Sequence, residues 1–147
     1  MKKTITASLL LSTLALSGTL HAADNEAVIK HRVGVMEAIG GHFGAAFSSM
    51  RGMPQFNSNQ VFHAESVARL ATIAKDIFPE GSDKGKTKAK AAIWEQPEDF
   101  NKLMDDFILK AEAFATAAKA NDLKAYGAAA KDLGGACKAC HDDFKKK

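Results

Sequence analysis

Two cysteines and a histidine stand together late in the chain, in the run Cys137-Lys138-Ala139-Cys140-His141. Cys-x-x-Cys-His is the pattern through which c-type haem is attached to a protein. On a helix, positions i, i+3 and i+4 share one face, so both thiols can form thioethers with the two vinyl groups of one porphyrin. The imidazole can then ligate the iron from the same side. The pattern predicts one covalent haem c, attached through Cys137 and Cys140, with His141 as an axial ligand of the iron.

Three other uses of these cysteines, the only two in the chain, agree less well with the sequence. A disulfide between them would close so short a loop that it would constrain little of the unfolded chain. A thioredoxin-like redox pair is expected after a strand, at the start of a helix, whereas this pair falls late in a helical pattern. A zinc site needs four ligands, and His31, His42 and His63 lie on other segments without paired spacing.

The position of the motif limits what can cover the other side of the iron. Six residues follow His141 in this sequence, and none of them is a strong iron ligand. We therefore expect an upstream helix to cover the opposite face of the haem, or that face to stay open.

Four segments have the helical period, with apolar residues at steps of three and four. They cover about residues 24–50, about residues 57–77, a segment that starts near Pro97 and stops at Asn121, and about residues 122–144. No segment alternates with the period of two that a half-buried strand shows. Four amphipathic helices with mostly short connections predict an all-α fold, an antiparallel up-down-up-down four-helix bundle.

Turn and cap residues mark the ends of these segments. Asp24 or Asn25 is expected to cap the first helix, Asn57 the second, and Asn121 the last. Residues 78–92 contain proline, two glycines and several lysines, a composition that predicts a surface loop with solvated lysine side chains.

The first residues have the layout of a secretory signal peptide. Lys2 and Lys3 precede an apolar, uncharged run, and Ala22 offers a small residue for cleavage. We expect residues 1–22 to be a cleaved signal peptide and residues 23–147 to form the domain, with no membrane segment after cleavage. Lys and Arg total 20 against 17 Asp and Glu, without an extended basic block. Nucleic acid is therefore not an expected partner.

The chain resembles the cytochrome c-prime family over essentially the whole predicted mature segment. That family has the haem-bearing four-helix bundle. The sequence features that carry the resemblance are the closing run from Gly135 to Asp142 with its lysine tail, His31-Arg32, His42-Phe43-Gly44 and Ile93-Trp94.

The resemblance implies roles for individual residues. Arg32 matches an arginine that contacts a haem propionate, and Met36 matches the distal residue that overhangs the open side of the iron. Phe78 matches an aromatic packed beside the haem, and Lys145 matches a basic residue near the proximal histidine. The position after Arg32 is often a haem-contacting glutamine in the family, and here it is Val33.

The resemblance also implies a function. We expect a periplasmic haem protein with a five-coordinate, high-spin iron, which binds small diatomic gases such as nitric oxide and carbon monoxide, or transfers electrons to redox partner proteins. The alternative is a low-spin electron carrier with Met36 as the sixth iron ligand. No catalytic triad, carboxylate pair or phosphate loop is present, so an enzyme is not expected. Family members often dimerise through their first two helices, where Phe47, Met50 and Phe62 offer apolar side chains.

Overall fold

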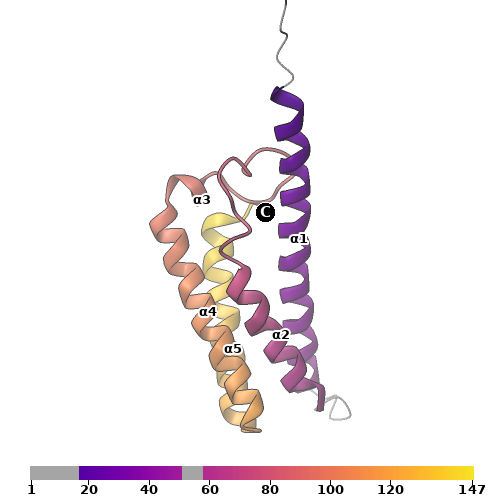
Figure 1. Cartoon of the computed structure of the whole chain (residues 1–147). Coiled ribbons are helices and arrows are strands. Elements are labelled where there is room, and N and C mark those ends of the chain that lie inside the picture. Colours follow the sequence, from indigo (N-terminus) through magenta and orange to yellow (C-terminus); the bar gives the residue numbers. More distant parts are fainter. Residues whose placement is uncertain (1–16, 51–57) are drawn as a thin grey trace, which may run out of the picture.

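Four long helices pack side by side in the structure, a computed structural model that describes residues 17–50 and 58–147. In chain order the elements are α1 (Ser17–Met50), α2 (Gln60–Ile73), the short α3 (Ala92–Glu95), α4 (Pro97–Lys119) and α5 (Leu123–Phe144). Figure 1 shows the long helices running alternately down and up. The described residues contain no strand, only one isolated antiparallel bridge, between Ala89 and Lys145. The predicted all-α antiparallel four-helix bundle is confirmed.

The order of packing along the bundle is α1 on α2, α2 on α4, and α4 on α5. Where α2 contacts α4, the side chains of Ala64, Ala71 and Ala111 are fully buried, and their small size lets the two helices pack closely. Aromatic rings fill the interior where the later turns of α4 meet the first turn of α5, and there Phe114 and Tyr126 stack with ring centroids 4.7 Å apart. Buried rings of this size remove a large apolar area from water, and so they stabilise this part of the bundle.

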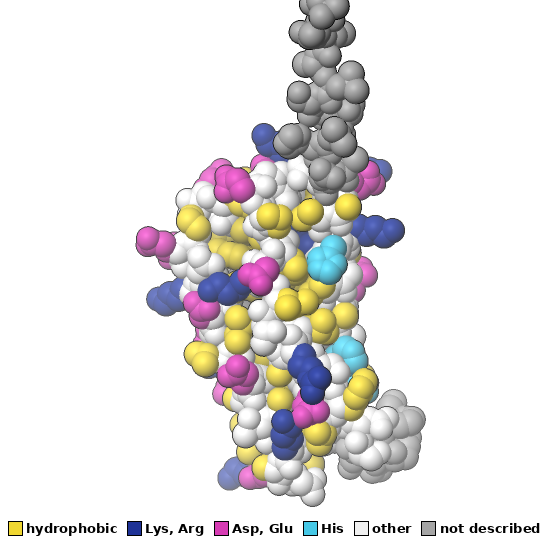
Figure 2. Space-filling model, in the orientation of Figure 1, with side chains coloured by type: hydrophobic (Ala, Val, Ile, Leu, Met, Phe, Trp, Pro, Cys, Tyr) yellow, Lys and Arg dark blue, Asp and Glu magenta, His cyan; other side chains and the backbone are white. Residues whose placement is uncertain are grey.

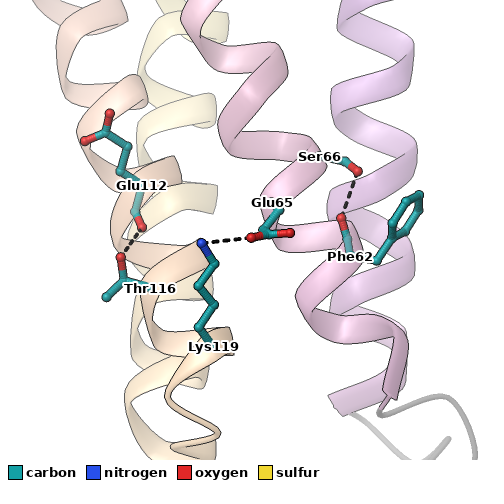
Figure 3. A network of polar contacts seen from close by, with 6 residues as sticks. All are labelled: Phe62, Glu65, Ser66, Glu112, Thr116 and Lys119. Carbon is teal, nitrogen blue, oxygen red and sulfur yellow. Dashed lines mark hydrogen bonds and ion pairs between the residues drawn. The ribbon is translucent and has the colours of Figure 1, made fainter.

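Ion pairs at the surface join α2 to α4. Glu65 and Lys119 lie 2.8 Å apart (Figure 3). Beyond the last turn of α2, Lys75 pairs with Asp105 at 2.8 Å. Exposed pairs of this kind contribute about 0–1 kcal/mol each. Their contribution to the stability of the bundle is therefore small.

The start of α1 differs from the prediction. The helix already includes Ser17 and runs without a break through Asp24 and Asn25. The expected cap at Asp24 or Asn25 is therefore wrong, because the Ala22-Ala23 pair before it favours helix. Asn25 instead donates a side-chain hydrogen bond to the carbonyl oxygen of Gly81 at 2.8 Å. The helix overlaps the predicted signal peptide, and cleavage after residue 22 stays a prediction.

Two other helix boundaries also differ from those expected. The residue before α2 is Asn59, whose side chain makes no capping bond, and the expected cap Asn57 lies outside the described residues. Asp122, not Asn121, caps α5: its carboxylate accepts bonds from the backbone N–H groups of Lys124 and Ala125, both at 3.0 Å. Asn121 takes the left-handed turn conformation just before it, with φ of 54°.

The segment of residues 78–91 folds back onto α1 and does not form a solvated loop throughout. Gly85 has φ of 126°, and a Cβ atom there would lie 2.9 Å from Cδ1 of Ile29. Any other residue would be strained in backbone and would also collide with α1. Ser82 in the same segment is fully buried. The segment is thus part of the packed structure at the end of the bundle where α5 finishes.

Charged side chains of both signs are interspersed with apolar ones on the face seen in Figure 2. Within the described parts of the chain, none of the helices has the length and apolar character needed to cross a membrane.

Candidate haem site

The predicted attachment residues occupy the last two turns of α5. Cys137 and Cys140 are half-buried against the core, and neither forms a disulfide. Burial raises the pKa of the Cys137 thiol. Burial, with smaller contributions from Cys137 and Asp143, raises the pKa of Cys140 to about 11. No group of three or more metal-ligating side chains exists among the described residues, so the structure does not favour the zinc alternative.

His141 follows on the exposed side of the same turn. Partial desolvation, and then the positive charge of Lys145, lower the pKa of its imidazole, against an opposing effect of Asp142. Lys145 also donates its backbone N–H to the carbonyl oxygen of His141 at 3.2 Å. The structure therefore places Lys145 beside the predicted proximal histidine, and the low pKa favours the neutral imidazole that ligates a metal.

The end of α5 is held by a residue that sequence reasoning did not single out. The Lys90 ammonium donates to the carbonyl oxygens of Asp142 and Asp143, both at 2.9 Å. The Lys90 backbone N–H donates to the carbonyl of Phe144 at 2.9 Å. A cation at the last carbonyls satisfies orphan acceptors and complements the helix dipole. This contact joins residues some fifty positions apart, and no local sequence pattern predicts it.

Arg32 is buried, at 3% exposed, on the face of α1 turned to the 78–91 segment. Its guanidinium donates to the hydroxyl of Ser82 at 2.8 Å, the carbonyl of Ser82 at 2.9 Å and the hydroxyl of Thr87 at 2.9 Å. The same group lies over the rings of Phe78, at 5.0 Å, and Trp94, at 5.8 Å. The structure thus brings Arg32 and Phe78 together, as two members of the predicted site. Ser82 and Thr87 were missed, because short hydroxyl residues in a loop carry no periodic signal.

The charge of Arg32 has no carboxylate partner within the described residues, since all its hydrogen bonds go to neutral oxygens. Burial lowers the pKa of the group. Buried arginines are almost always paired with an anion. A haem propionate would supply the missing negative charge, so the residues present fit the expected prosthetic group.

The two helices that carry the remaining site residues, α1 and α5, meet at Phe43 and Gly134. A Cβ atom on Gly134 would lie 3.8 Å from the tip of the Phe43 ring. The helices run in opposite directions (Figure 1). Seven residues back along α1 from this contact is Met36, and seven residues forward along α5 is His141. Both steps cover about 10 Å, so the register sets Met36, which is half-buried, at the level of His141 on the facing helix.

Comparison with known proteins gives a consistent answer. A family model described as Cytochrome C′ matches residues 27–145. The cytochrome c′ of Pararhodospirillum photometricum is 34% identical over 125 residues, which cover 84% of this chain and 100% of that relative.

Solved structures agree with this match. Cytochrome c prime from Shewanella frigidimarina is similar with a TM-score of 0.79 and 35% identity, over 84% of this chain and 97% of that one. A ferrous variant of cytochrome c prime from Alcaligenes xylosoxidans with bound NO gives a TM-score of 0.77 and 29% identity, over 84% and 96% of the two chains. Proteins of this family carry a covalently bound haem c, and the attachment pattern is present here. The chain belongs to the cytochrome c′ family.

Proposed function

We propose that this protein is a periplasmic haem protein whose five-coordinate, high-spin iron binds small neutral diatomic molecules. The observation that carries the proposal is the register of α1 and α5, which brings an apolar side chain, Met36, to the level of His141 on the facing helix. Nitric oxide is the foremost candidate ligand, because the similar protein from Alcaligenes xylosoxidans has been solved with NO bound.

Several residues of this chain would each make a different contact with the haem. Cys137 and Cys140 would hold the haem through thioethers, and His141 would ligate its iron. Arg32 would supply a positive charge for a propionate, and Phe78, whose ring lies under the Arg32 guanidinium, would supply an apolar surface for the porphyrin. Partial desolvation, and then the charge of Lys145, lower the pKa of His141 and so favour the neutral imidazole. When bound, the haem supplies an iron that takes up one electron or one small ligand.

Met36 decides which ligands reach the distal side. Arg32, one turn earlier on α1, is a strong donor, but its hydrogen bonds go to Ser82 and Thr87. The residue before Met36 is Val35 and the residue a turn later is Ile39, both buried and apolar. Met36, Val35 and Ile39 cannot donate a strong hydrogen bond, and such donors are what stabilises bound oxygen and anions. Neutral diatomic molecules need no donor, so this lining selects them.

The same register supports a second candidate function, electron transfer with Met36 as the sixth iron ligand. A thioether sulfur set at the level of His141 could coordinate the iron directly. Ligation of iron by histidine and methionine raises the reduction potential, and it would close the site to gases. Methionine has three rotatable bonds, and fixing one rotamer over the iron costs conformational entropy. For this reason the unligated arrangement is the first candidate.

Optical and electron paramagnetic resonance spectra of the purified ferric and ferrous protein test the proposal. We expect high-spin spectra in both states and a new spectrum when carbon monoxide or nitric oxide is added to the ferrous protein. A low-spin ferrous spectrum that these gases leave unchanged would refute the gas-binding function and support electron transfer.

Two further parts of the proposal concern the whole protein. Export with removal of residues 1–22 predicts a mature chain that starts at Ala23, which mass spectrometry of the protein from the periplasmic fraction can check. A homodimer through α1 and α2 is supported by apolar side chains at the surface: Phe62 is 62% and Phe47 36% exposed. Light scattering that shows a monomer at micromolar concentration would refute the dimer.

A further inference from the structure

A pair of histidines bridges α1 and α2 away from the haem-binding residues. His42 on α1 and His63 on α2 face each other with their Nδ1 atoms 2.9 Å apart. Their ring centroids are 5.2 Å apart, and both rings are half-buried. We propose that this pair is a binding site for a divalent transition metal ion, with Cu²⁺ the preferred ion.

The protonation state that this contact requires is compatible with the binding of a cation. A hydrogen bond between two Nδ1 atoms requires one imidazole to donate and the other to present a bare lone pair. The contact therefore holds a single proton between two nitrogens. When an ion binds both Nδ1 atoms, the donor ring gives up its Nδ1 proton to solvent and takes one up at Nε2, so that both rings are neutral ligands, the form of imidazole that binds metals.

The separation of the two nitrogens suits a shared metal ion. Metal–nitrogen bonds of about 2.0–2.1 Å place two cis ligands roughly 2.9 Å apart at a right angle, and about 3.4 Å apart at a tetrahedral angle. The observed 2.9 Å matches the right angle. To bind one ion, each imidazole has to rotate until the lone pair on its Nδ1 points to a shared position at one side of the line that joins the two nitrogens. The helix backbones do not have to move.

The number and kind of ligands indicate the metal. Right-angled nitrogen ligation is typical of tetragonal Cu²⁺ and Ni²⁺ sites, and Cu²⁺ is the tighter of the two in the general order of affinity. The described residues offer no third histidine, cysteine or carboxylate in a group with this pair. Water would therefore complete the coordination, and the site would be exchangeable, not structural.

Phe62 lies against both rings and defines one side of the site. Its ring centroid is 5.7 Å from that of His42 and 5.4 Å from that of His63. Figure 3 shows Phe62 on α2 beside α1.

The site is independent of the haem. His42 is adjacent to Phe43 in sequence, but successive helical residues point about 100° apart. Phe43 meets α5, whereas His42 meets α2. An ion at the pair would therefore cross-link α1 to α2 without entering the space between α1 and α5.

Titration of the purified, chelator-treated haem protein with Cu²⁺ tests the proposal, by calorimetry for stoichiometry and by electron paramagnetic resonance for the ligands. We expect one ion per chain, a copper signal with coupling to two nitrogens, and a higher unfolding temperature with copper, because a ligand of the folded state stabilises it. Loss of even an indirect partner of a metal weakens binding by about 10–100-fold. His42→Gln and His63→Gln should therefore each weaken it at least about tenfold.

The matched control is His31→Gln, which removes an exposed histidine of the same helix outside the pair. This variant should bind copper like the parent protein. The inference is overturned if the parent shows no stoichiometric binding, if either pair variant binds as tightly as the parent, or if copper couples to only one nitrogen. These readouts do not involve the haem ligands, so their failure would leave the proposed function untouched.

Discussion

The guanidinium of Arg32 donates a hydrogen bond to the hydroxyl of Ser82, 2.8 Å away and fifty residues further along the chain. Ser82 in turn donates to the carbonyl oxygen of Pro79 at 2.8 Å and is fully buried. Arg32 is therefore hydrogen-bonded to the 78–91 segment even without a propionate. The position of its side chain on α1 thus depends on a segment that has no helical or strand period in the sequence.

Replacing Ser82 should destabilise the fold. Ser82→Ala removes an acceptor of the buried charge, and hydrogen bonds to charged groups contribute about 1.5–3 kcal/mol. We expect the free energy of unfolding, measured in urea, to fall by about that amount. Ser48→Ala is the control, because Ser48 is exposed on α1 and bonds only to the carbonyl of Gly44. Its effect should stay within about 0.5 kcal/mol. Equal losses in both variants would argue against a special role for Ser82.

Met36→Ala separates the two candidate functions. If Met36 only covers the iron, the ferric protein should stay high-spin, while carbon monoxide binds faster and more tightly to the opened site. Stopped-flow mixing of the ferrous variant with carbon monoxide measures this. Glu37→Ala, an exposed neighbour, should behave like the parent. A change from a low-spin to a high-spin spectrum in Met36→Ala would instead identify Met36 as an iron ligand.

Covalent attachment can be tested directly. After denaturation and extraction with acidified organic solvent, the haem should stay on the chain and appear as added mass in mass spectrometry. Cys137→Ala should retain haem through one thioether and lose part of it during purification, and replacement of both cysteines should release all of it. Free extraction of the haem from the parent protein would disprove the attachment.

The histidine pair predicts a loss of stability in acid. Desolvation, and then the charge of His42, lower the pKa of His63 below its ordinary value of 6.5. The unfolded chain therefore takes up a proton at a higher pH than the folded chain does. His63 therefore leaves the free energy of unfolding unchanged above about pH 6.5 and lowers it as the pH falls through and below that value. His63→Gln should make this part of the unfolding profile flatter, whereas His31→Gln should leave its slope unchanged.

Tyr126 offers a test of the core. It is 1% exposed and stacked on Phe114, and its hydroxyl has no hydrogen-bond partner among the described residues. Burial raises its pKa to about 12. Since it is the only tyrosine, any tyrosinate signal in an ultraviolet titration comes from it, and ionisation should occur well above the ordinary pH range. Tyr126→Phe should leave stability unchanged or raise it by about 1 kcal/mol, because an unsatisfied polar group is removed. A clear loss of stability would reveal a partner for the hydroxyl.

Regular features of this fold could be read from the sequence. The three- and four-residue steps predicted all four long helices, and Pro97 correctly marked the start of α4. Helix ends were less predictable, because Asp122 and Asn121 are equally good caps by type and only the backbone conformation distinguishes them.

Contacts between distant segments were not predictable. Nothing in the local sequence pairs Arg32 with Ser82, or Lys90 with the end of α5. The sequence did place His42 and His63 on separate helices, but their meeting depends on the register of α1 against α2. Such pairings are set by tertiary packing, which periodicity does not encode.

The half-buried thiols of α5 have a consequence for the attachment of haem. Thiolate is the reactive form of cysteine, and in the folded bundle the pKa of Cys140 is about 11, with that of Cys137 also raised. A chain that closed its bundle first would hold both sulfurs protonated and half-covered. Both thiols should therefore react with haem more readily in a chain whose last helix is still open than in the closed bundle.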